Sequence, residues 1–560
     1  VTAPIEVLGR TAEELQLKKN THIGMDIQFD WERRDAFVQQ PNGSLFSWSE
    51  RYQCLAHLIF GVVNESSVPV KLTIVEEFRD IEWKDKEPLI ERLKAEGFVK
   101  EVFPLHDEKQ RCELLHNWAY NWMGLTSQPI DAIYSYFGAK VATYFAFLGM
   151  YTKWLLFPSV LGIFFHSVNF GSWQVAVLSI FSMIVVSWSV LFLQFWRRKN
   201  AALLLRWNVS RPGNVEPGSR PTESEQRALN QLTPGGVIIG SNNMPLNEQR
   251  TALDRHEWRE NLKSLRNNVI VISGILCLQL PFELTYTHLN HIIESQIWKY
   301  VLTALYLLII QYYTKFGGNL AERLVKTQHY DSREARADGL VYKVFGLYFM
   351  QNYIGLFYHA LFHRDIELLR TFLIQRLIVS QVLNNVLENL GPYVKYRYTK
   401  YFAIKRKHKK GSLHQHTSRI EKEYMKPSYT ASVGEGVEDG LFDDFLELAL
   451  QYGMVTMFAC AFPLVFLFAA VNNLTEIRTD SLKLLAMLRR PIPRAASSIG
   501  AWLNIFEFLG VIAICSNCAL LVCLHDRDGK WEIEPGLATF VFIEHVLLLM
   551  KFGFSFLVPE

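Results

Sequence analysis

Long apolar segments are the feature of this sequence that most restricts its fold. Eight stretches are long enough to cross the hydrocarbon core of a bilayer as a helix, which takes about 20 residues. They are residues 141–163, 173–195, 268–288, 297–317, 341–361, 370–392, 499–523 and 536–558. Of the 560 residues, 49% are hydrophobic and 20% are charged, so soluble parts are expected beside the spans. A net charge of only +3 argues against a globally basic nucleic-acid-binding protein.

A ninth stretch, residues 448–475, has 28 residues without a charge and is interpreted as two spans. Its flanks are basic, because eleven Lys or Arg lie in 395–426 and four more lie in 483–494. Basic loops stay in the cytosol, so both flanks are on one side and an even number of crossings separates them. A hairpin that breaks at Pro463 meets this condition, whereas one straight helix does not. The predicted arms are 444–462 and 464–487.

The same rule predicts ten spans with both termini in the cytosol. Loops 164–172 and 289–296 contain no Lys or Arg, whereas the loops predicted to be cytosolic contain many. The predicted fold class is mainly α, a polytopic membrane protein. Ten transmembrane helices (138–560) follow an α+β cytosolic N-terminal domain (1–137). The predicted cytosolic loops are 196–267, 318–340 and 393–440.

Local patterns support the α+β assignment of the N-terminal domain. Residues 69–76 alternate between apolar and polar side chains, as a strand does. Residues 88–96 have the pattern of a helix that Gly97 would end. Residues 98–103 are predicted to form another strand.

Carboxylates flank the charge-free stretch on both sides. Each arm has about 14 uncharged residues, roughly 21 Å of helix, which is shorter than the hydrocarbon core. Asp444 and Glu447 on one arm, with Glu476 and Asp480 on the other, are therefore expected within the membrane or at its edge. Because Glu447 and Glu476 are almost symmetric about Pro463, we expect them to face each other.

A third predicted span contributes a matching pair. Asn384 and Glu388 are four residues apart, as are Glu476 and Asp480, and residues at this spacing share a helix face. Asn472 lies one turn before Glu476 on the same face. Ordinary acids that reach water at helix ends are the alternative, and three pairs on three consecutive spans disfavour it.

Five carboxylates at membrane depth need a counter-charge. Unpaired, they would cost on the order of 12 to 18 kcal/mol on an insertion scale, and Arg478 is one cation against five acids. Ligands that are all oxygen favour Ca²⁺ or Mg²⁺ over zinc or copper, and their number suits Ca²⁺. Two Ca²⁺ ions best balance five negative charges. The expected ligands are Asn384, Glu388, Asp444, Glu447, Asn472, Glu476 and Asp480.

These motifs carry a family resemblance. They are Asn384-x-x-x-Glu388, Asp444-x-x-Glu447 and Asn472-Asn473-x-x-Glu476-x-x-x-Asp480, together with Gln128-Pro129-Ile130-Asp131 and Leu488-Arg489-Arg490-Pro491. With them the chain resembles the anoctamin family of membrane proteins over residues 75–560. The resemblance implies a ten-helix homodimer with two Ca²⁺ ions per subunit, held between the sixth, seventh and eighth helices. It also implies a groove formed by the third to seventh helices, through which family members pass chloride or other ions, scramble phospholipids, or both.

Two features depart from the family pattern. Asp444 stands where many members have Glu, and its shorter reach is expected to weaken Ca²⁺ binding. The second helix has Leu193-Gln194-Phe195 where related members often have an acid, which leaves open an additional Ca²⁺ site near the dimer interface. The external loops lack the cysteines of many cell-surface members. The chain therefore resembles the simpler, intracellular type, an integral protein of the endoplasmic reticulum or plasma membrane.

The leading hypothesis is a Ca²⁺-activated phospholipid scramblase with accompanying ion conductance, whose partners are phospholipids and inorganic ions. Lipid headgroups would need a polar stripe that is open to the membrane. Interfacial anchoring and helix contacts are the alternative roles of the same residues. The expected groove residues are Tyr312, Tyr313, Gln351, Tyr353, Gln375, Arg376, Ser380 and Gln381.

Two other functions stay open, and no nucleophile–base set or phosphate loop predicts an enzyme. A Ca²⁺-activated chloride channel needs cations in the membrane, for which Lys343 and Arg376 are candidates. A membrane-contact tether without transport could use the basic segment 395–426 on anionic lipid, although a tether does not need buried carboxylates.

A hinge is predicted one turn below Glu388, at Gly391 and Pro392. Glycine makes a helix less stiff and proline removes a backbone hydrogen bond. We expect the lower part of this helix to move when Ca²⁺ binds Glu388.

Overall fold

The computed structural model describes the larger part of the chain. The described residues are 2–40, 43–64, 70–74, 79–84, 87–122, 127–168, 171–207, 262, 266–267, 269–271, 273–293, 295–328, 333–362, 366–375, 377, 386, 390–391, 393–402, 405, 418–431, 440–494, 496, 498–525, 546 and 553.

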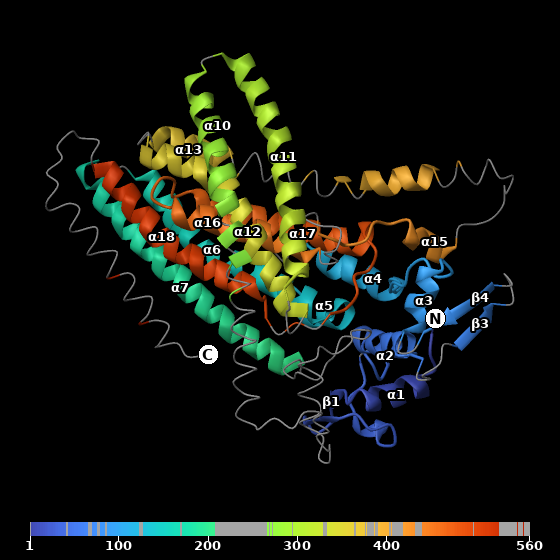
Figure 1. Ribbon diagram of the computed structural model, residues 1–560. Helices are drawn as coiled ribbons and strands as arrows, with labels where there is room; N and C mark the ends of the chain where they lie inside the picture. The colour runs from blue at the N-terminus through green and yellow to red at the C-terminus, as the bar shows by residue number, and fades with distance from the viewer. Residues whose placement is uncertain are drawn as a thin grey trace, which may run out of the picture.

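Short helices and two antiparallel hairpins form the N-terminal part (Figure 1). Its elements are α1 (Ile5–Glu14), β1 (Lys18–Asn20), β2 (Asp26–Gln28), η1 (Arg34–Ala36), α2 (Trp48–Phe60), β3 (Val70–Ile74), β4 (Arg79–Trp83), α3 (Leu89–Ala95), α4 (Glu108–Leu114) and η2 (Leu115–Ala119). β1 pairs with β2 and β3 pairs with β4. The predicted strand at 69–76 and the predicted helix at 88–96 are confirmed.

Long helices form the rest of the described chain. They are α5 (Ile130–Phe137), α6 (Ala139–Ser167), η3 (Gly171–Trp173), α7 (Gln174–Trp207), η4 (Ile275–Gln279), α10 (Leu280–Ile292), α11 (Gln296–Lys326), α12 (Arg333–Phe357), η5 (Tyr358–Phe362), α13 (Ile366–Ile374), α15 (Arg419–Tyr424), α16 (Leu441–Met457), α17 (Val465–Leu482), η7 (Lys483–Met487) and α18 (Ala501–His525). Among the described residues, three segments are long and apolar enough to cross a membrane: Ala139–Ser167, Val177–Trp207 and Ala501–Leu520.

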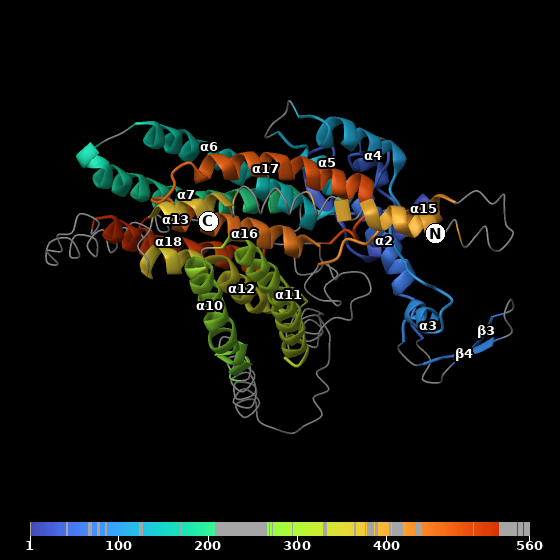
Figure 2. The same ribbon diagram turned by 90° about the horizontal axis from the view of Figure 1, so that it is seen from above.

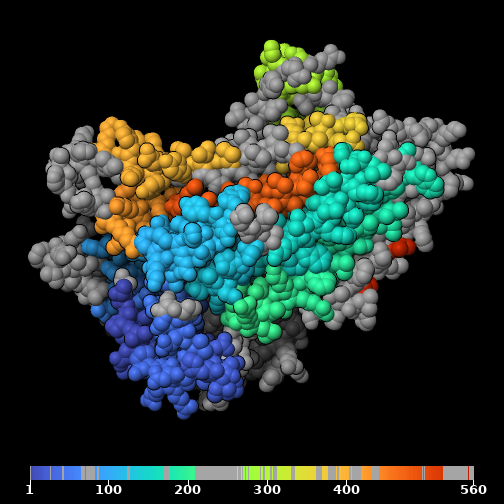
Figure 3. Space-filling view, turned by 180° about the vertical axis from the view of Figure 1, so that it is seen from behind, coloured from blue at the N-terminus to red at the C-terminus, as the bar shows by residue number. Residues whose placement is uncertain are grey.

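Two hydrophobic cores are present in the described chain. The smaller one joins α1, α2 and the β1–β2 hairpin around the rings of Phe29, Phe37 and Phe46. The larger one begins at Leu114 and continues through the long helices to Leu520. From behind, the N-terminal residues form a lobe at one end of the helical body (Figure 3). Because the larger core includes residues of α4 and α5, the segment from α4 to α5 packs with the long helices.

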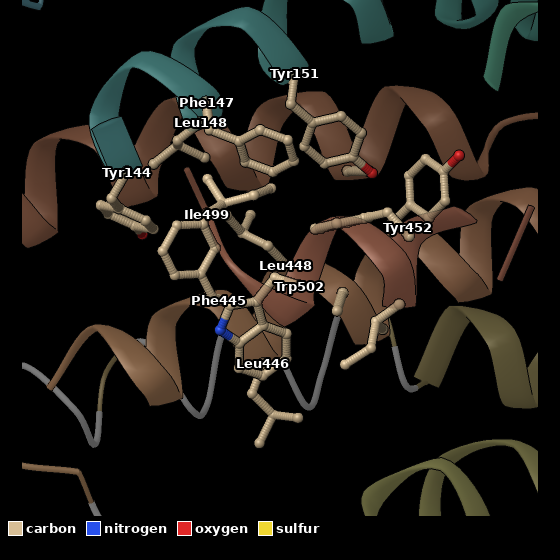
Figure 4. Packing of buried hydrophobic residues seen from close by; sticks show 14 of the residues in the cluster. Tyr144, Phe147, Leu148, Tyr151, Phe445, Leu446, Leu448, Tyr452, Ile499 and Trp502 are labelled. Carbon is tan, nitrogen blue, oxygen red and sulfur yellow. The ribbon is translucent and has the colours of Figure 1, made fainter. Parts of the chain in front are cut away.

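The helical body is built around α6, α7, α16, α17 and α18. α17 packs along α6, α16 packs on α18, and α18 packs on α7, as both ribbon views show (Figures 1 and 2). Aromatic side chains fill the space between α6 and α16 (Figure 4): the Tyr144 and Phe445 rings are 5.2 Å apart, and the Tyr151 and Tyr452 rings 6.0 Å apart. α10 and α11 extend away from this body beside α12 (Figure 2).

The chain breaks between α16 and α17, as the sequence predicts. α16 ends at Met457 and α17 begins at Val465, with Pro463 inside the break. Asn517 of α18 satisfies backbone groups there, because it donates to the Thr456 carbonyl at 2.7 Å and accepts from the Cys460 amide at 3.3 Å. The predicted arms 444–462 and 464–487 are thus two separate helices.

One predicted element is wrong. Residues 98–103 form no strand, since both the Phe98 and Val99 amides donate to the Leu93 carbonyl and close the end of α3. The chain then runs on beside α15, where the Phe103 ring lies 6.3 Å from the Tyr424 ring. The last predicted span, 536–558, lies outside the described residues except for two positions.

Candidate functional site

α16 and α17 carry the described part of the acidic set. Asp444 lies in the first turn of α16, where the helix dipole favours a negative charge, and Glu447 follows three residues later. On α17, Asn472, Glu476 and Asp480 repeat every four residues and therefore share one face. The two helices run back along each other, so these residues meet at the end away from Pro463.

Asp444 and Asp480 are joined by a lysine. The Lys483 ammonium lies 3.1 Å from Asp444 Oδ1 and 3.2 Å from Asp480 Oδ1. The Tyr144 hydroxyl donates to Asp480 Oδ2 at 2.7 Å, and the Tyr429 hydroxyl donates to Asp444 Oδ2. All three charged side chains are buried. This half of the set has its negative charge partly balanced by the protein itself.

Glu447 and Glu476 form the other half. Their side chains interact across the two helices, as their symmetry about Pro463 predicts. The Asn472 amide donates to Glu476 Oε1 at 2.9 Å, and Glu476 Oε2 is buried without a hydrogen-bond donor among the described residues. Two carboxyl groups in contact need a shared proton or a cation between them.

Arg478 points away from the acids. Its guanidinium is buried and donates to the Trp118 carbonyl at 2.6 Å, so it joins α17 to η2. The counter-charge is Lys483, which sequence reasoning had counted only as part of a basic flank. Its position three residues after Asp480 was the available signal. Tyr144 and Tyr429 gave no such signal, because they are distant in sequence from the acids.

The described residues fit a hard cation in part. Within the described ranges, no three His, Cys, Asp or Glu side chains are grouped closely enough to hold a metal by themselves. However, the atoms available as metal ligands are all oxygens, and Glu447 and Glu476 face each other. The Lys483 ammonium already lies between two carboxylates, where it takes the place of a cation. The predicted ligands Asn384 and Glu388 lie outside the described residues.

The predicted groove residues that the structure describes differ in their exposure. Tyr312 and Gln375 are exposed, and the Tyr313 ring lies 5.5 Å from that of Phe282. Tyr353 is fully buried and donates to the Leu450 carbonyl at 2.7 Å, so it joins α12 to α16. Gln351 is also buried. Arg376, Ser380, Gln381 and the hinge residue Pro392 lie outside the described residues, while Gly391 is exposed.

A separate cavity of about 750 Å³ opens between α6 and α7. Its lining is largely apolar and includes Trp154, Phe157, Met183 and Trp188, with Lys153 as its charged residue. None of the predicted metal or groove residues contributes to it.

Comparison with known proteins decides the family. The sequence profile described as "Anoctamin: Calcium-activated chloride channel" matches residues 133–560. The chain belongs to the anoctamin family. It is similar to Anoctamin-10 of Mus musculus, with 31% identity over 490 residues that cover 84% of this chain and 70% of that protein.

More distant anoctamins match as well. Anoctamin-7 of Homo sapiens is 28% identical over 78% of this chain and 55% of its own length. Anoctamin-1 of Homo sapiens is 23% identical over 77% of this chain and 55% of its own length. The family resemblance inferred from the acidic motifs is therefore confirmed. Membership in a family of membrane proteins also agrees with the mainly helical structure.

Proposed function

We propose that this anoctamin is a Ca²⁺-activated phospholipid scramblase with accompanying ion conductance. The proposal takes it to be a ten-span homodimer with both termini in the cytosol and two Ca²⁺ ions per subunit. The observation that carries it is the contact between the half-buried Glu447 and the buried Glu476, which places two acids together in the helical body. A purely structural pair would be costly to retain without a cation.

The Ca²⁺ ligands, the hinge and the groove residues have separate roles in this proposal. The residues that would hold Ca²⁺ are Asn384, Glu388, Asp444, Glu447, Asn472, Glu476 and Asp480. Bound Ca²⁺ would supply the positive charge that the set lacks. Glu388 would then be held close to α16 and α17, and the hinge at Gly391 and Pro392 would let the rest of its helix follow. The exposed Tyr312 and Gln375 would offer hydroxyl and amide groups to lipid headgroups.

A Ca²⁺-activated chloride channel is the second candidate. The description of the matching family profile favours it. An anion pathway needs cations, and Lys343 of α12 is buried with its ammonium 3.3 Å from Gln328 Oε1 and 3.3 Å from the Gly339 carbonyl. Both acceptors are neutral, so they leave the lysine charge uncancelled.

Reconstitution of the full chain in liposomes tests the proposal. Lipid flipping and chloride flux are measured side by side while Ca²⁺ is titrated. We expect Ca²⁺ to activate flipping in the wild type. Glu447→Gln should raise the Ca²⁺ requirement ten- to hundredfold, because a loss of about 1.4 to 3 kcal/mol of binding energy has that effect. Transport at saturating Ca²⁺ should partly survive.

The control is Asp443→Asn, which removes an acid of α16 one turn before Glu447 and outside the predicted ligand set. It should leave the Ca²⁺ titration unchanged. Overlapping curves for the wild type and Glu447→Gln would show that the acidic set is not the Ca²⁺ switch. Chloride flux without lipid flipping would favour the channel.

A further inference from the structure

Lys483 is held on three sides inside the acidic set. Besides its ion pairs to Asp444 and Asp480, its ammonium lies 5.8 Å from the centre of the Tyr429 ring. The residue is 3% exposed. It directly follows α17, so its positive charge also complements the negative end of that helix dipole.

Lysine and a divalent cation would compete for the same atoms. The Oδ1 atoms of Asp444 and Asp480 already contact the ammonium, and their Oδ2 atoms accept from tyrosine hydroxyls. A Ca²⁺ ion bound to these carboxylates would lie next to a positive charge in a site of low dielectric, where repulsion is strong. The long, flexible lysine side chain can move without rearrangement of the backbone.

We propose that Lys483 is a tethered competitor of Ca²⁺, which neutralises Asp444 and Asp480 when the metal is absent and leaves when the metal binds. This inference rests on the proposed Ca²⁺ site. Its consequence is that Lys483 stabilises the metal-free protein and lowers the apparent Ca²⁺ affinity. The contrasting case is a permanent structural ion pair, with Ca²⁺ held only by the half of the set around Glu447 and Glu476.

Direct binding measurements separate the two cases. Purified full chain in detergent is titrated with Ca²⁺ by calorimetry, and its thermal unfolding is followed with EGTA and with Ca²⁺. Lys483→Met keeps a long apolar stem but removes the charge. We expect a lower unfolding temperature in EGTA, because two buried acids lose their partner. We also expect Ca²⁺ affinity to rise on the order of tenfold, as removal of a nearby like charge predicts.

Two further variants sharpen the test. Lys426→Met removes another partly buried lysine, whose ammonium lies 3.6 Å from Glu423 Oε1 and which is not part of the acidic set. This variant should leave Ca²⁺ affinity unchanged. Lys483→Arg keeps the charge and adds donors that can hold both carboxylates, so it should weaken Ca²⁺ binding. If Lys483→Met does not fold, this variant carries the test.

The outcomes are distinguishable. If the wild type binds Ca²⁺ and Lys483→Met binds it equally or more weakly, Lys483 does not compete with Ca²⁺. The proposed function would then still stand. A Lys483→Arg variant that binds Ca²⁺ as tightly as the wild type would also overturn it. A wild type that binds no Ca²⁺ would contradict the proposed function itself.

Discussion

His106 is one of the residues through which the N-terminal segment contacts the helical body. Its ring is buried, with Nδ1 3.0 Å from the Tyr136 hydroxyl and Nε2 3.4 Å from the Leu488 carbonyl oxygen. Arg490 lies over the Tyr136 ring and donates to the Tyr136 carbonyl at 2.5 Å. Burial, and after it the charges of Lys426 and Arg490, lowers the pKa of His106 to about 3. The imidazole is therefore neutral at pH 7.

This shift predicts a pH-dependent stability. Above about pH 6.5, the ordinary pKa of histidine, the ring is neutral in both the folded and unfolded chain. Below that pH the unfolded chain gains a proton that the folded chain does not gain until about pH 3. As the pH is lowered from 6.5 toward 3, the free energy of unfolding therefore falls by about 1.4 kcal/mol per pH unit. His106→Gln removes this dependence.

The measurement compares the unfolding of wild type and His106→Gln in mixed micelles at pH 8 and pH 5. The variant should be less stable at pH 8, and the difference should shrink by about 2 kcal/mol at pH 5. His116→Gln, which changes an exposed histidine of η2, should keep the wild-type profile. A His106→Gln penalty that is equal at both pH values would contradict a buried neutral ring.

Residue types and one pairing could be predicted at the site, but the counter-charge could not. The repeats of Asn, Glu and Asp on one helix face were visible in sequence, as was the pairing of Glu447 with Glu476 about Pro463. The choice of Lys483 over Arg478 as the counter-charge was not, because it depends on the rotation of α17 about its own axis. That rotation turns Arg478 toward η2 and is set by packing against α6.

At the scale of elements, the break between α16 and α17 depends on a close approach by α6. A Cβ atom added at Gly162 would collide with the backbone carbonyl of Pro463. The contact therefore needs glycine on α6, and it places the end of α6 against the turn of the hairpin. Because the colliding atom belongs to the backbone, no side-chain rotation can relieve the clash.

Gly162→Ala should therefore destabilise the protein by about 1 to 3 kcal/mol, as overpacking does. The lower unfolding temperature should be visible with and without Ca²⁺. Gly510→Ala is the matched control, since its Cβ would lie at an ordinary 3.4 Å from Ser189 Oγ. Equal stability of the two variants would show that α6 does not support the break.

The predicted hinge at Gly391 and Pro392 is tested by replacing both residues with alanine. A Cβ at Gly391 meets no atom of the described residues within 4 Å, so we expect an effect on backbone stiffness and not a clash. We expect an altered Ca²⁺ dependence of lipid flipping in liposomes. Gly274→Ala, at another helical glycine whose added Cβ would meet none of the described atoms within 4 Å, should have no effect. Unchanged gating of the double variant would place the hinge elsewhere.

The type of an element could be predicted from sequence where the pattern was long. The prediction failed where only a few residues determined the local structure. Uninterrupted apolar stretches predicted α6, α7 and α18 well. The error at residues 98–103 arose because a short segment rich in Phe and Val favours an extended chain but does not supply a partner strand. Side-chain contacts such as that between Phe103 and Tyr424 hold this segment instead.

For the whole molecule, the hairpin constrains how the chain crosses the membrane. Asp444 and Lys483 are 39 residues apart in sequence and yet form an ion pair at 3.1 Å. The start of α16 and the end of α17 therefore lie at the same end of the hairpin. The proposed topology therefore places the basic segments before and after it on the same side of the membrane, which the distribution of Lys and Arg predicts to be the cytosol.

Epitope tags test this arrangement in cells whose plasma membrane is opened selectively with digitonin. A tag within 411–418 and, in a separate variant, a tag at the exposed Ile492 should both bind antibody under these conditions. Ile492 suits an insertion better than its neighbour Pro493, which is buried and packs against Gly138.

A tag within 164–172, in a loop without Lys or Arg, is the matched control. It should bind antibody only after full solubilisation if the protein lies in an internal membrane. Opposite sides for the first two tags would require an odd number of crossings between them. The two acidic helices could not then form a hairpin, and the proposed Ca²⁺ site would fail with it.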